Sequence, residues 1–190
     1  MIDYSLFKTN KEDFKEQYRD AEEELPYRMP EPRGRPVVTT AFVDASHASN
    51  KKSRRSHTGY VIFVNRAPVM WYSKRQQTVE SSAFSSEFIA MRACILAIKA
   101  LRYKLRMFGI PFEGPTHVFS DNESLTKNAS KVESTLNKKH SSIAYNLTRW
   151  SVAAGETTIA WIKGTENIAD GFTKLLPETT RNYLFGNWTY

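Results

Sequence analysis

Cysteine is almost absent from this sequence: there is one, Cys94, among 190 residues. A single cysteine cannot form an internal disulfide, and it excludes zinc sites built from several cysteines. Long apolar runs are also missing, because Arg92, Lys99 and Arg102 interrupt the longest candidate. The N-terminal segment alternates charged with aromatic residues and has no signal-peptide core. We therefore expect an intracellular protein that has no membrane partner.

Acidic residues are scarce in the larger part of the chain. Residues 37–190 hold eleven acids and twenty bases, whereas residues 1–36 hold nine acids and seven bases. A basic globular part suits a polyanionic partner such as nucleic acid. An excess of basic residues also keeps a protein soluble, so the charge alone does not decide between nucleic-acid binding and solubility.

The chain divides into three segments by composition and periodicity. Residues 1–36 carry four of the eight prolines, which predicts a short helix and an extended lead-in that adds no core element. Residues 37–177 carry the periodic apolar patterns of one α/β domain. Residues 178–190 remain as a C-terminal tail.

Five strands and three main helices are predicted within the domain. The apolar patterns place strands at 37–43, 59–64, 69–73, 117–120 and 157–162. A long helix starts near Ser82 and stops before Gly109, and further helices are expected at about 133–154 and 167–176. A hairpin followed by helix-connected strands indicates a mixed sheet flanked by helices.

Only three aspartates follow residue 37. Asp44 and Asp121 lie where predicted strands end, and Asp170 lies in the first turn of the last predicted helix, after the fifth strand. Glu87, near the start of the long helix, is the natural fourth member of the set. Singly, a strand-end aspartate is a common turn residue, and a glutamate in a first helical turn serves the helix dipole. Together, converging carboxylates need a cation between them. Oxygen ligands without histidine or cysteine suit two Mg²⁺ ions, with Mn²⁺ as a substitute.

Six short motifs occur in a fixed order along residues 37–177. They read FVDASHA (42–48), WYSKRQQTVESS (71–82), SEF (86–88), SDNES (120–124), KH (139–140) and IADGFTK (168–174). Together they resemble the ribonuclease H domain of copia-type LTR-retrotransposon polyproteins. The individual motifs are short, and the specificity of the resemblance comes from their combination.

This resemblance implies a ribonuclease-H-like α/β fold and a metal-dependent endoribonuclease. The expected reaction is hydrolysis of the RNA strand of RNA–DNA hybrids during reverse transcription. By motif position, the catalytic and metal-binding roles fall on Asp44, Glu87, Asp121 and Asp170. Residues 1–36 resemble the connection to an upstream reverse-transcriptase domain. The expected location is the cytoplasm or a virus-like particle, with the nucleus as the alternative.

One departure from related cellular enzymes concerns histidine. Their loop after the fifth strand often carries a mobile histidine, whereas residues 163–167 here read KGTEN. His140, on the second long helix, is not an obvious replacement. Retroelement enzymes resemble the present chain in this respect, so we expect modest turnover and not inactivity.

Basic and small polar residues near the acids are the candidates for nucleic-acid binding. Phosphate contacts need such donors along a track that follows the duplex backbone, and short polar groups can recognise 2′-hydroxyls. The candidates are Lys51, Lys52, Arg54, Arg55, Lys74, Arg75, Gln76, Ser81 and Ser82. The bases in the second half of the long helix, from Lys99 to Arg106, are equally well explained as a solvated face. Trp71, Tyr72, Trp150 and Trp161 are expected in the core.

Two other functions compete with the hybrid endonuclease. A catalytically silent module of the same fold would bind nucleic acid or a polymerase partner without cleaving. A strand-transfer enzyme of the integrase type is disfavoured, because its glutamate would lie on a late helix and Glu87 lies on the first long one.

Overall fold

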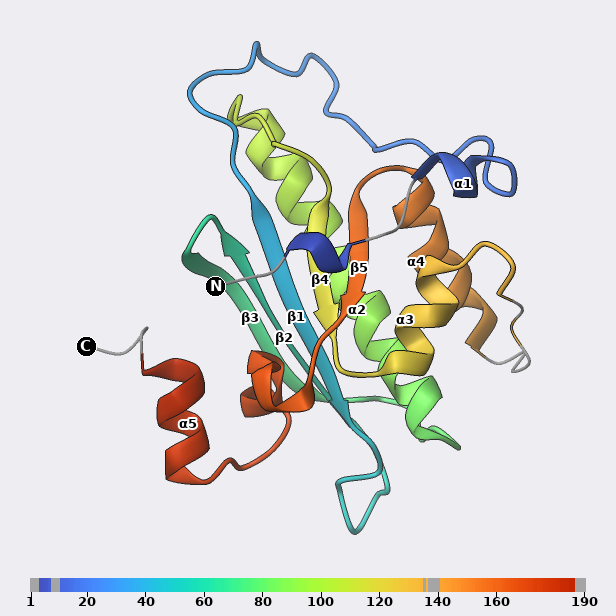
Figure 1. The fold of residues 1–190 in the computed structure, drawn as a ribbon, viewed down its shortest axis with the longest axis vertical. Coiled ribbons are helices and arrows are strands. Elements are labelled where there is room, and N and C mark those ends of the chain that lie inside the picture. Colours follow the sequence, from blue (N-terminus) through green and yellow to red (C-terminus); the bar gives the residue numbers. More distant parts are fainter. Residues whose placement is uncertain (1–3, 8–10, 135, 137–140, 187–190) are drawn as a thin grey trace.

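A five-stranded sheet forms the centre of the molecule (Figure 1). The computed structural model describes residues 4–7, 11–134, 136 and 141–186. The strands are β1 (Thr39–Ser46), β2 (His57–Val64), β3 (Ala67–Arg75), β4 (Thr116–Ser120) and β5 (Thr157–Trp161). Their order across the sheet is β3-β2-β1-β4-β5.

The sheet is mixed, as the sequence predicts. The loop 47–56 joins β1 to β2 and the turn 65–66 joins β2 to β3, and both pairs are antiparallel. Strands β4 and β5 are reached through helices and run parallel to β1 and to each other. This follows from chain geometry, because a turn or loop can reverse the chain direction whereas a parallel pair needs a crossover connection.

Helices cover the two faces of the sheet unequally (Figure 1). One face packs against the longer helices α2 (Ala83–Met107), α3 (Glu123–Ser130) and α4 (Ser142–Ala153). The other face carries the short helices η1 (Tyr4–Leu6) and η4 (Ile168–Phe172). Elements α1 (Lys11–Lys15), η3 (Gly164–Glu166) and α5 (Glu178–Phe185) complete the described chain.

The apolar stripe of α2 forms the centre of the larger core. Phe88, Ile95 and Ile98 are at most 1% exposed, and Cys94 lies among them with a fully buried thiol. The stripe predicted from the sequence is correct in its middle. Leu101, near its C-terminal end, is only partly buried.

Two predicted helix boundaries are wrong. The helix expected from about residue 133 is α4, which begins at Ser142; residues 135 and 137–140, including His140, lie outside the described residues. The carbonyls of Lys131 and Val132 accept hydrogen bonds from the buried Arg149 guanidinium, and these residues form a turn. The helix expected at 167–176 is the five-residue 3-10 helix η4, and α5 forms in the expected tail.

The prediction that residues 1–36 add no core element is also wrong. Phe14 is completely buried and belongs to the main core, and Ala21 is 2% exposed. The guanidinium of Arg149 lies 4.8 Å from the centre of the Phe14 ring. The N-terminal segment is thus packed into the domain across the compositional boundary at residue 36.

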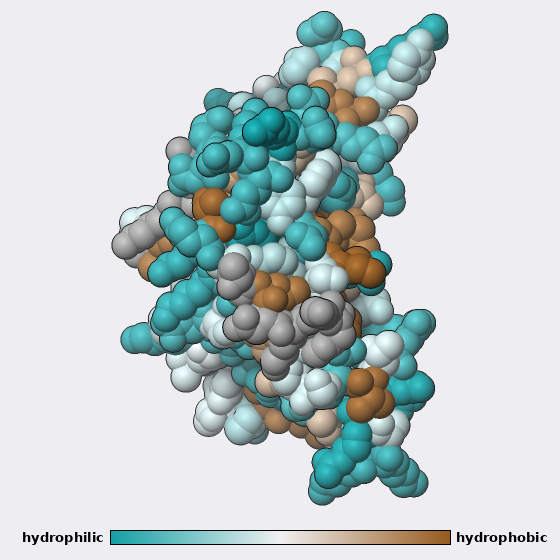
Figure 2. All heavy atoms as spheres, turned by 90° about the vertical axis from the view of Figure 1, so that its right-hand side faces the viewer, coloured by the Kyte–Doolittle hydropathy of each residue, from teal (hydrophilic) through white to brown (hydrophobic). Residues whose placement is uncertain are grey.

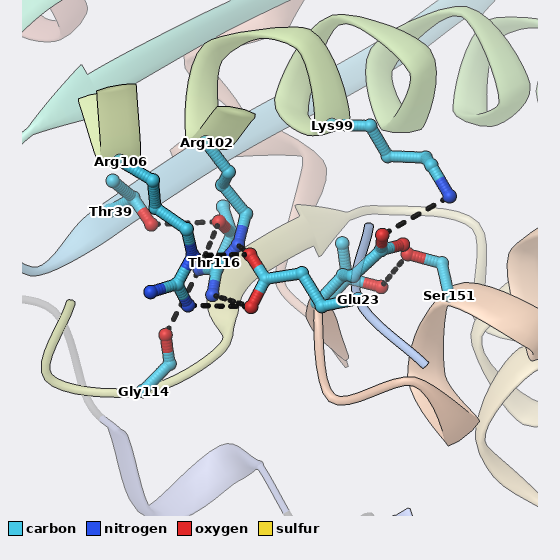
Figure 3. A network of polar contacts seen from close by, with 10 residues as sticks. Glu23, Thr39, Lys99, Arg102, Arg106, Gly114, Thr116 and Ser151 are labelled. Atoms are coloured by element: carbon cyan, nitrogen blue, oxygen red, sulfur yellow. Dashed lines mark hydrogen bonds and ion pairs between the residues drawn. The ribbon is translucent and has the colours of Figure 1, made fainter. Parts of the chain in front are cut away.

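Glu23 fastens the same segment to the far end of α2 (Figure 3). Its carboxylate accepts hydrogen bonds from Arg102 Nε at 2.7 Å and from Arg106 Nε at 3.1 Å. Burial acts to raise the pKa of Glu23, but the hydrogen bonds from both arginines lower it. Lys99, one turn earlier, pairs with Glu156 at 3.1 Å. Three bases of this helix are therefore paired with two carboxylates within the protein, which argues against a phosphate track there.

Two of the four aromatic residues expected in the core are exposed. Trp71 is 64% exposed and Trp161 is 41% exposed, whereas Tyr72 and Trp150 are partly buried against the main core. Trp71 lies on the edge strand β3, where alternate residues face away from the long helices. On the face shown in Figure 2, apolar residues form small separate patches among polar ones. None of the described helices has the length and apolar character needed to cross a membrane.

Candidate metal centre

Three carboxylates from three elements meet beside the middle of the sheet. Asp44 lies within β1, Glu87 in the first turn and a half of α2, and Asp121 directly after β4. Each contributes one oxygen, and these three atoms lie within 4.8 Å of one another. Asp44 was expected to follow its strand; instead β1 continues to Ser46, because the pairing with β2 extends that far.

Asp170 reaches the same region from η4. A Cβ on Gly59, which pairs with Asp44 across the β1–β2 ladder, would lie 2.6 Å from Thr173 Cγ2 and 2.8 Å from Phe172 Cβ. Only glycine at this position lets the end of η4 lie this close to the sheet. The fourth predicted acid is therefore brought to the site by the close packing of η4 against β2.

Burial and mutual repulsion dominate the electrostatics of the three-carboxylate cluster. Burial, opposed by a hydrogen bond from Thr173, raises the pKa of Asp44 to about 6. Burial together with the nearby charges of Asp44 and Asp121 raises the pKa of Glu87 to about 9. Burial and the charge of Asp170 also raise the pKa of Asp121. Without a cation, the cluster is electrostatically unfavourable in its fully ionised form.

The residues present fit a hard divalent cation. Glu87 is 7% exposed, and within the described part of the chain no hydrogen-bond donor reaches its Oε2 atom. A buried carboxylate oxygen without a donor is costly unless a positive ion binds it. The donor set consists of carboxylate oxygens, which Mg²⁺ and Mn²⁺ prefer.

Three residues to which the sequence assigned no role support the carboxylates. Asn167, fully buried, donates from Nδ2 to the Val43 carbonyl at 3.1 Å and to Asp121 Oδ1 at 3.2 Å. Thr173 donates its hydroxyl proton to Asp44 Oδ2. Lys174 Nζ lies 2.8 Å from Asp170 Oδ1 and 3.5 Å from Asp44 Oδ2. The i,i+4 spacing of Asp170 and Lys174 was the available sequence signal.

The predicted basic loop joins β1 to β2 next to the carboxylates. Its backbone is fixed by Asn50, whose Oδ1 accepts from the Ser53 amide at 2.8 Å and whose carbonyl accepts from the Arg54 amide at 2.7 Å. The basic side chains point outward, and all four are exposed: Lys51, Lys52, Arg54 and Arg55. The loop thus presents positive charge on an ordered frame.

A second group of candidates lies at the end of β3, beside the end of the basic loop, where the Gln76 amide donates to the Ser56 carbonyl at 2.8 Å. Lys74 and Arg75 are exposed and line a groove of about 530 Å³ between β3, α2 and α4. Gln76 is 5% exposed, and its Nε2 donates to Thr58 Oγ1 and to the Ser86 carbonyl. Ser82 caps α2 by accepting from the Ser85 amide at 3.3 Å, whereas Ser81 is exposed. Gln76 and Ser82 therefore serve the local structure first.

The chain is similar in sequence to transposon polyproteins. No protein-family model matches the chain. A retrovirus-related Pol polyprotein from transposon RE1 of Arabidopsis thaliana is 25% identical over 147 residues, which cover 77% of this chain and 10% of that polyprotein. The chain thus spans about a tenth of this relative's length. The resemblance to retrotransposon polyproteins predicted from the motifs is confirmed.

Solved structures show the fold independently of sequence. The N-terminal RNase H domain of a Mycobacterium tuberculosis protein superposes with a TM-score of 0.54 at 11% identity, covering 80% of this chain and 99% of that one. The chain has the ribonuclease H fold. LC11-RNase H1 was solved in complex with an RNA/DNA hybrid and superposes with a TM-score of 0.56 at 12% identity. The match covers 71% of the present chain and 93% of the LC11-RNase H1 chain.

The raised carboxylate pKa values predict a stability that falls with pH when no metal is present. The folded protein keeps protons on Asp44 up to about pH 6 and on Glu87 up to about pH 9, whereas the unfolded chain releases them near the ordinary values of 3.8 and 4.5. Between the unfolded and the folded pKa of each group, the unfolded state binds fewer protons than the folded state. The free energy of unfolding therefore decreases as pH rises through this range. Urea denaturation in EDTA at several pH values measures this. Saturating Mg²⁺ should flatten the decrease, and an equally steep decrease with Mg²⁺ would contradict a cation at this cluster.

Proposed function

We propose that this chain is a metal-dependent endoribonuclease that cleaves the RNA strand of RNA–DNA hybrids. The observation that carries the proposal is the buried cluster of Asp44, Glu87 and Asp121 within a ribonuclease H fold, with Glu87 Oε2 lacking a donor. The transposon polyprotein relative supports reverse transcription as the setting. A fold alone does not define a reaction, so the proposal depends on the site.

The four acidic side chains would hold the metal. Asp44, Glu87 and Asp121 would bind one ion, and Asp44 with Asp170 would contribute to a second. Bound Mg²⁺ supplies activation of a water molecule and stabilisation of the leaving oxygen of a phosphodiester. Asn167 orients Asp121, and Thr173 orients Asp44, through the hydrogen bonds described above.

The surroundings of the cluster suit a duplex. The loop around Arg54 and Arg55 leads into β2, and the groove lined by Lys74 and Arg75 begins at the end of β3 beside it. These basic groups would position phosphates of the two strands, which gives affinity without sequence preference. Ser81, exposed before α2, is left as a candidate for a 2′-hydroxyl contact.

Cleavage of a labelled RNA–DNA hybrid tests the proposal directly. The purified chain should cut the RNA strand with Mg²⁺ or Mn²⁺ and not in EDTA, and it should leave double-stranded DNA and RNA intact. A chain that binds the hybrid tightly but never cuts it would instead be a silent binding module. That alternative draws support from Lys174, which already neutralises part of the acidic charge.

The basic loop gives a second, separate prediction. Replacing Arg54 and Arg55 by alanine should weaken binding of all hybrid sequences alike, and the slope of log K against log salt should fall by about one unit per lost phosphate contact. Fluorescence anisotropy over a salt series measures both. Arg66→Ala is the matched control, because this exposed base lies in the β2–β3 turn at the opposite end of β2. An unchanged slope in the double variant would exclude loop contacts with phosphate.

The full polyprotein context is part of the proposal. Because the curated relative is about ten times longer than the matched region, an upstream reverse-transcriptase domain is the proposed partner, as the sequence predicts. The cytoplasm or a virus-like particle, with the nucleus as the alternative, is the proposed location.

A further inference from the structure

Lys174 is a positive charge placed among the acids of the site. It follows Asp170 by one helical turn, and its Nζ contacts Asp170 Oδ1 at 2.8 Å and Asp44 Oδ2 at 3.5 Å. Its charge also opposes the burial that raises the pKa values of Glu87 and Asp121. The ammonium therefore interacts with all four carboxylates, most strongly with the two it contacts.

The acidic cluster has two unequal sides as a result. On the side of Glu87, the Oε2 atom meets no donor from the described residues. On the side of Asp170, the Lys174 ammonium lies between two carboxylates. Asp44 belongs to both sides, since it is close to Glu87 and Asp121 and is contacted by Lys174.

We infer that Lys174 is an internal counter-ion that competes with a divalent cation for the Asp44–Asp170 side of the site. This inference rests on the proposed metal-dependent function. An ammonium and a divalent ion are attracted by the same oxygens and repel each other at short range. Lys174 must therefore leave the gap between Asp44 and Asp170 before an ion binds there, whereas an ion on the Glu87 side displaces no protein charge.

The structure allows this displacement. The Lys174 side chain is 41% exposed, in contrast to 2% for Asp44, so its flexible stem can swing into solvent while the carboxylates stay in place. The consequence is two binding steps of different affinity. The first ion binds on the Glu87 side, and the second, weaker ion binds on the Asp170 side with Lys174 moved away.

Metal titration of a charge-removing variant tests the inference without measuring activity. Lys174→Gln keeps a polar, uncharged side chain that is one bond shorter, Lys174→Arg keeps the charge, and Lys127→Gln is the matched control. Lys127 forms an i,i+4 pair with Glu123 at 2.6 Å on the surface, so its loss removes a pair of the same spacing outside the site. Free Mn²⁺ measured by electron paramagnetic resonance, with isothermal titration calorimetry, resolves the two steps.

In Lys174→Gln, the affinity for the second, weaker-bound Mn²⁺ ion should increase by about tenfold. This is the size of effect that groups around metal ligands have on metal affinity. The melting temperature without metal should fall, because two carboxylates lose their counter-ion, and Mn²⁺ should raise it more than in the parent. Lys174→Arg and Lys127→Gln should bind Mn²⁺ as the parent does. This combination distinguishes competition from a general loss of structure.

Each opposite result is decisive. Unchanged or weaker Mn²⁺ binding by Lys174→Gln overturns the inference, even when the parent binds Mn²⁺ and cleaves the hybrid, in which case the proposed function stands. A parent that neither binds Mn²⁺ nor cleaves refutes the proposed function. In that case the inference stands only if Lys174→Gln binds Mn²⁺ where the parent does not, and it fails if the variant binds none.

Discussion

Replacement of Glu87 by glutamine should reduce cleavage of RNA–DNA hybrid by roughly two orders of magnitude or more, the size of effect of losing one electrostatic contact to a transition state. The amide keeps the shape of the side chain but removes the charge that would hold an ion against Asp44 and Asp121. Single-turnover cleavage with saturating hybrid measures the loss. Binding of the hybrid in Ca²⁺ or EDTA should be nearly unchanged, because the proposed phosphate contacts come from exposed bases.

The same variant should be at least as stable as the parent without metal. Glu87 is the carboxylate with the most strongly raised pKa of the cluster, about 9, and an amide cannot ionise there. At alkaline pH in EDTA, urea denaturation of Glu87→Gln should therefore give the larger free energy of unfolding. Glu166→Gln, an exposed neighbour in η3, is the control for removing one negative charge nearby. Equal cleavage by the parent and Glu87→Gln would refute the four-carboxylate assignment.

Replacement of Phe14 by alanine should lower the free energy of unfolding by about 3–5 kcal/mol, as for other fully buried phenylalanines. The loss includes the cavity in the main core and the contact with the Arg149 guanidinium, which Phe14 covers. Equilibrium denaturation in urea measures it. Because this residue lies in the predicted lead-in, the effect tests whether residues 1–36 are part of the folded domain.

Phe108 supplies the matched control, because it is 75% exposed at the C-terminal end of α2. Phe108→Ala should change stability by less than about 0.5 kcal/mol, as surface substitutions do. Similar values for the two variants would mean that Phe14 is not part of the core. Deletion of residues 1–36 should be more damaging than Phe14→Ala, since it also leaves Arg102 without the carboxylate of Glu23.

The features that depend on local pattern follow from the amino-acid sequence. The β-branched runs specified five strands, and the three- and four-residue spacing specified α2. The scarcity of aspartate after residue 37 singled out three acids of the site, and the place of Glu87 on the long helix added the fourth. The motif order indicated the ribonuclease H fold before any coordinates. These features are readable because periodicity and residue type record which face of an element is buried.

Tertiary structure alone decided the rest. Phe14 is buried because Arg149, far along the chain, lies against its ring, and no local pattern records that contact. Asp170 reaches the cluster because Gly59 on β2 admits η4, and Lys174 becomes its counter-ion only through that packing. The sequence left Arg102 and Arg106 open to phosphate binding or to a solvated face, and the structure pairs both with Glu23. Such pairings depend on which distant segments meet, and sequence spacing does not carry that information.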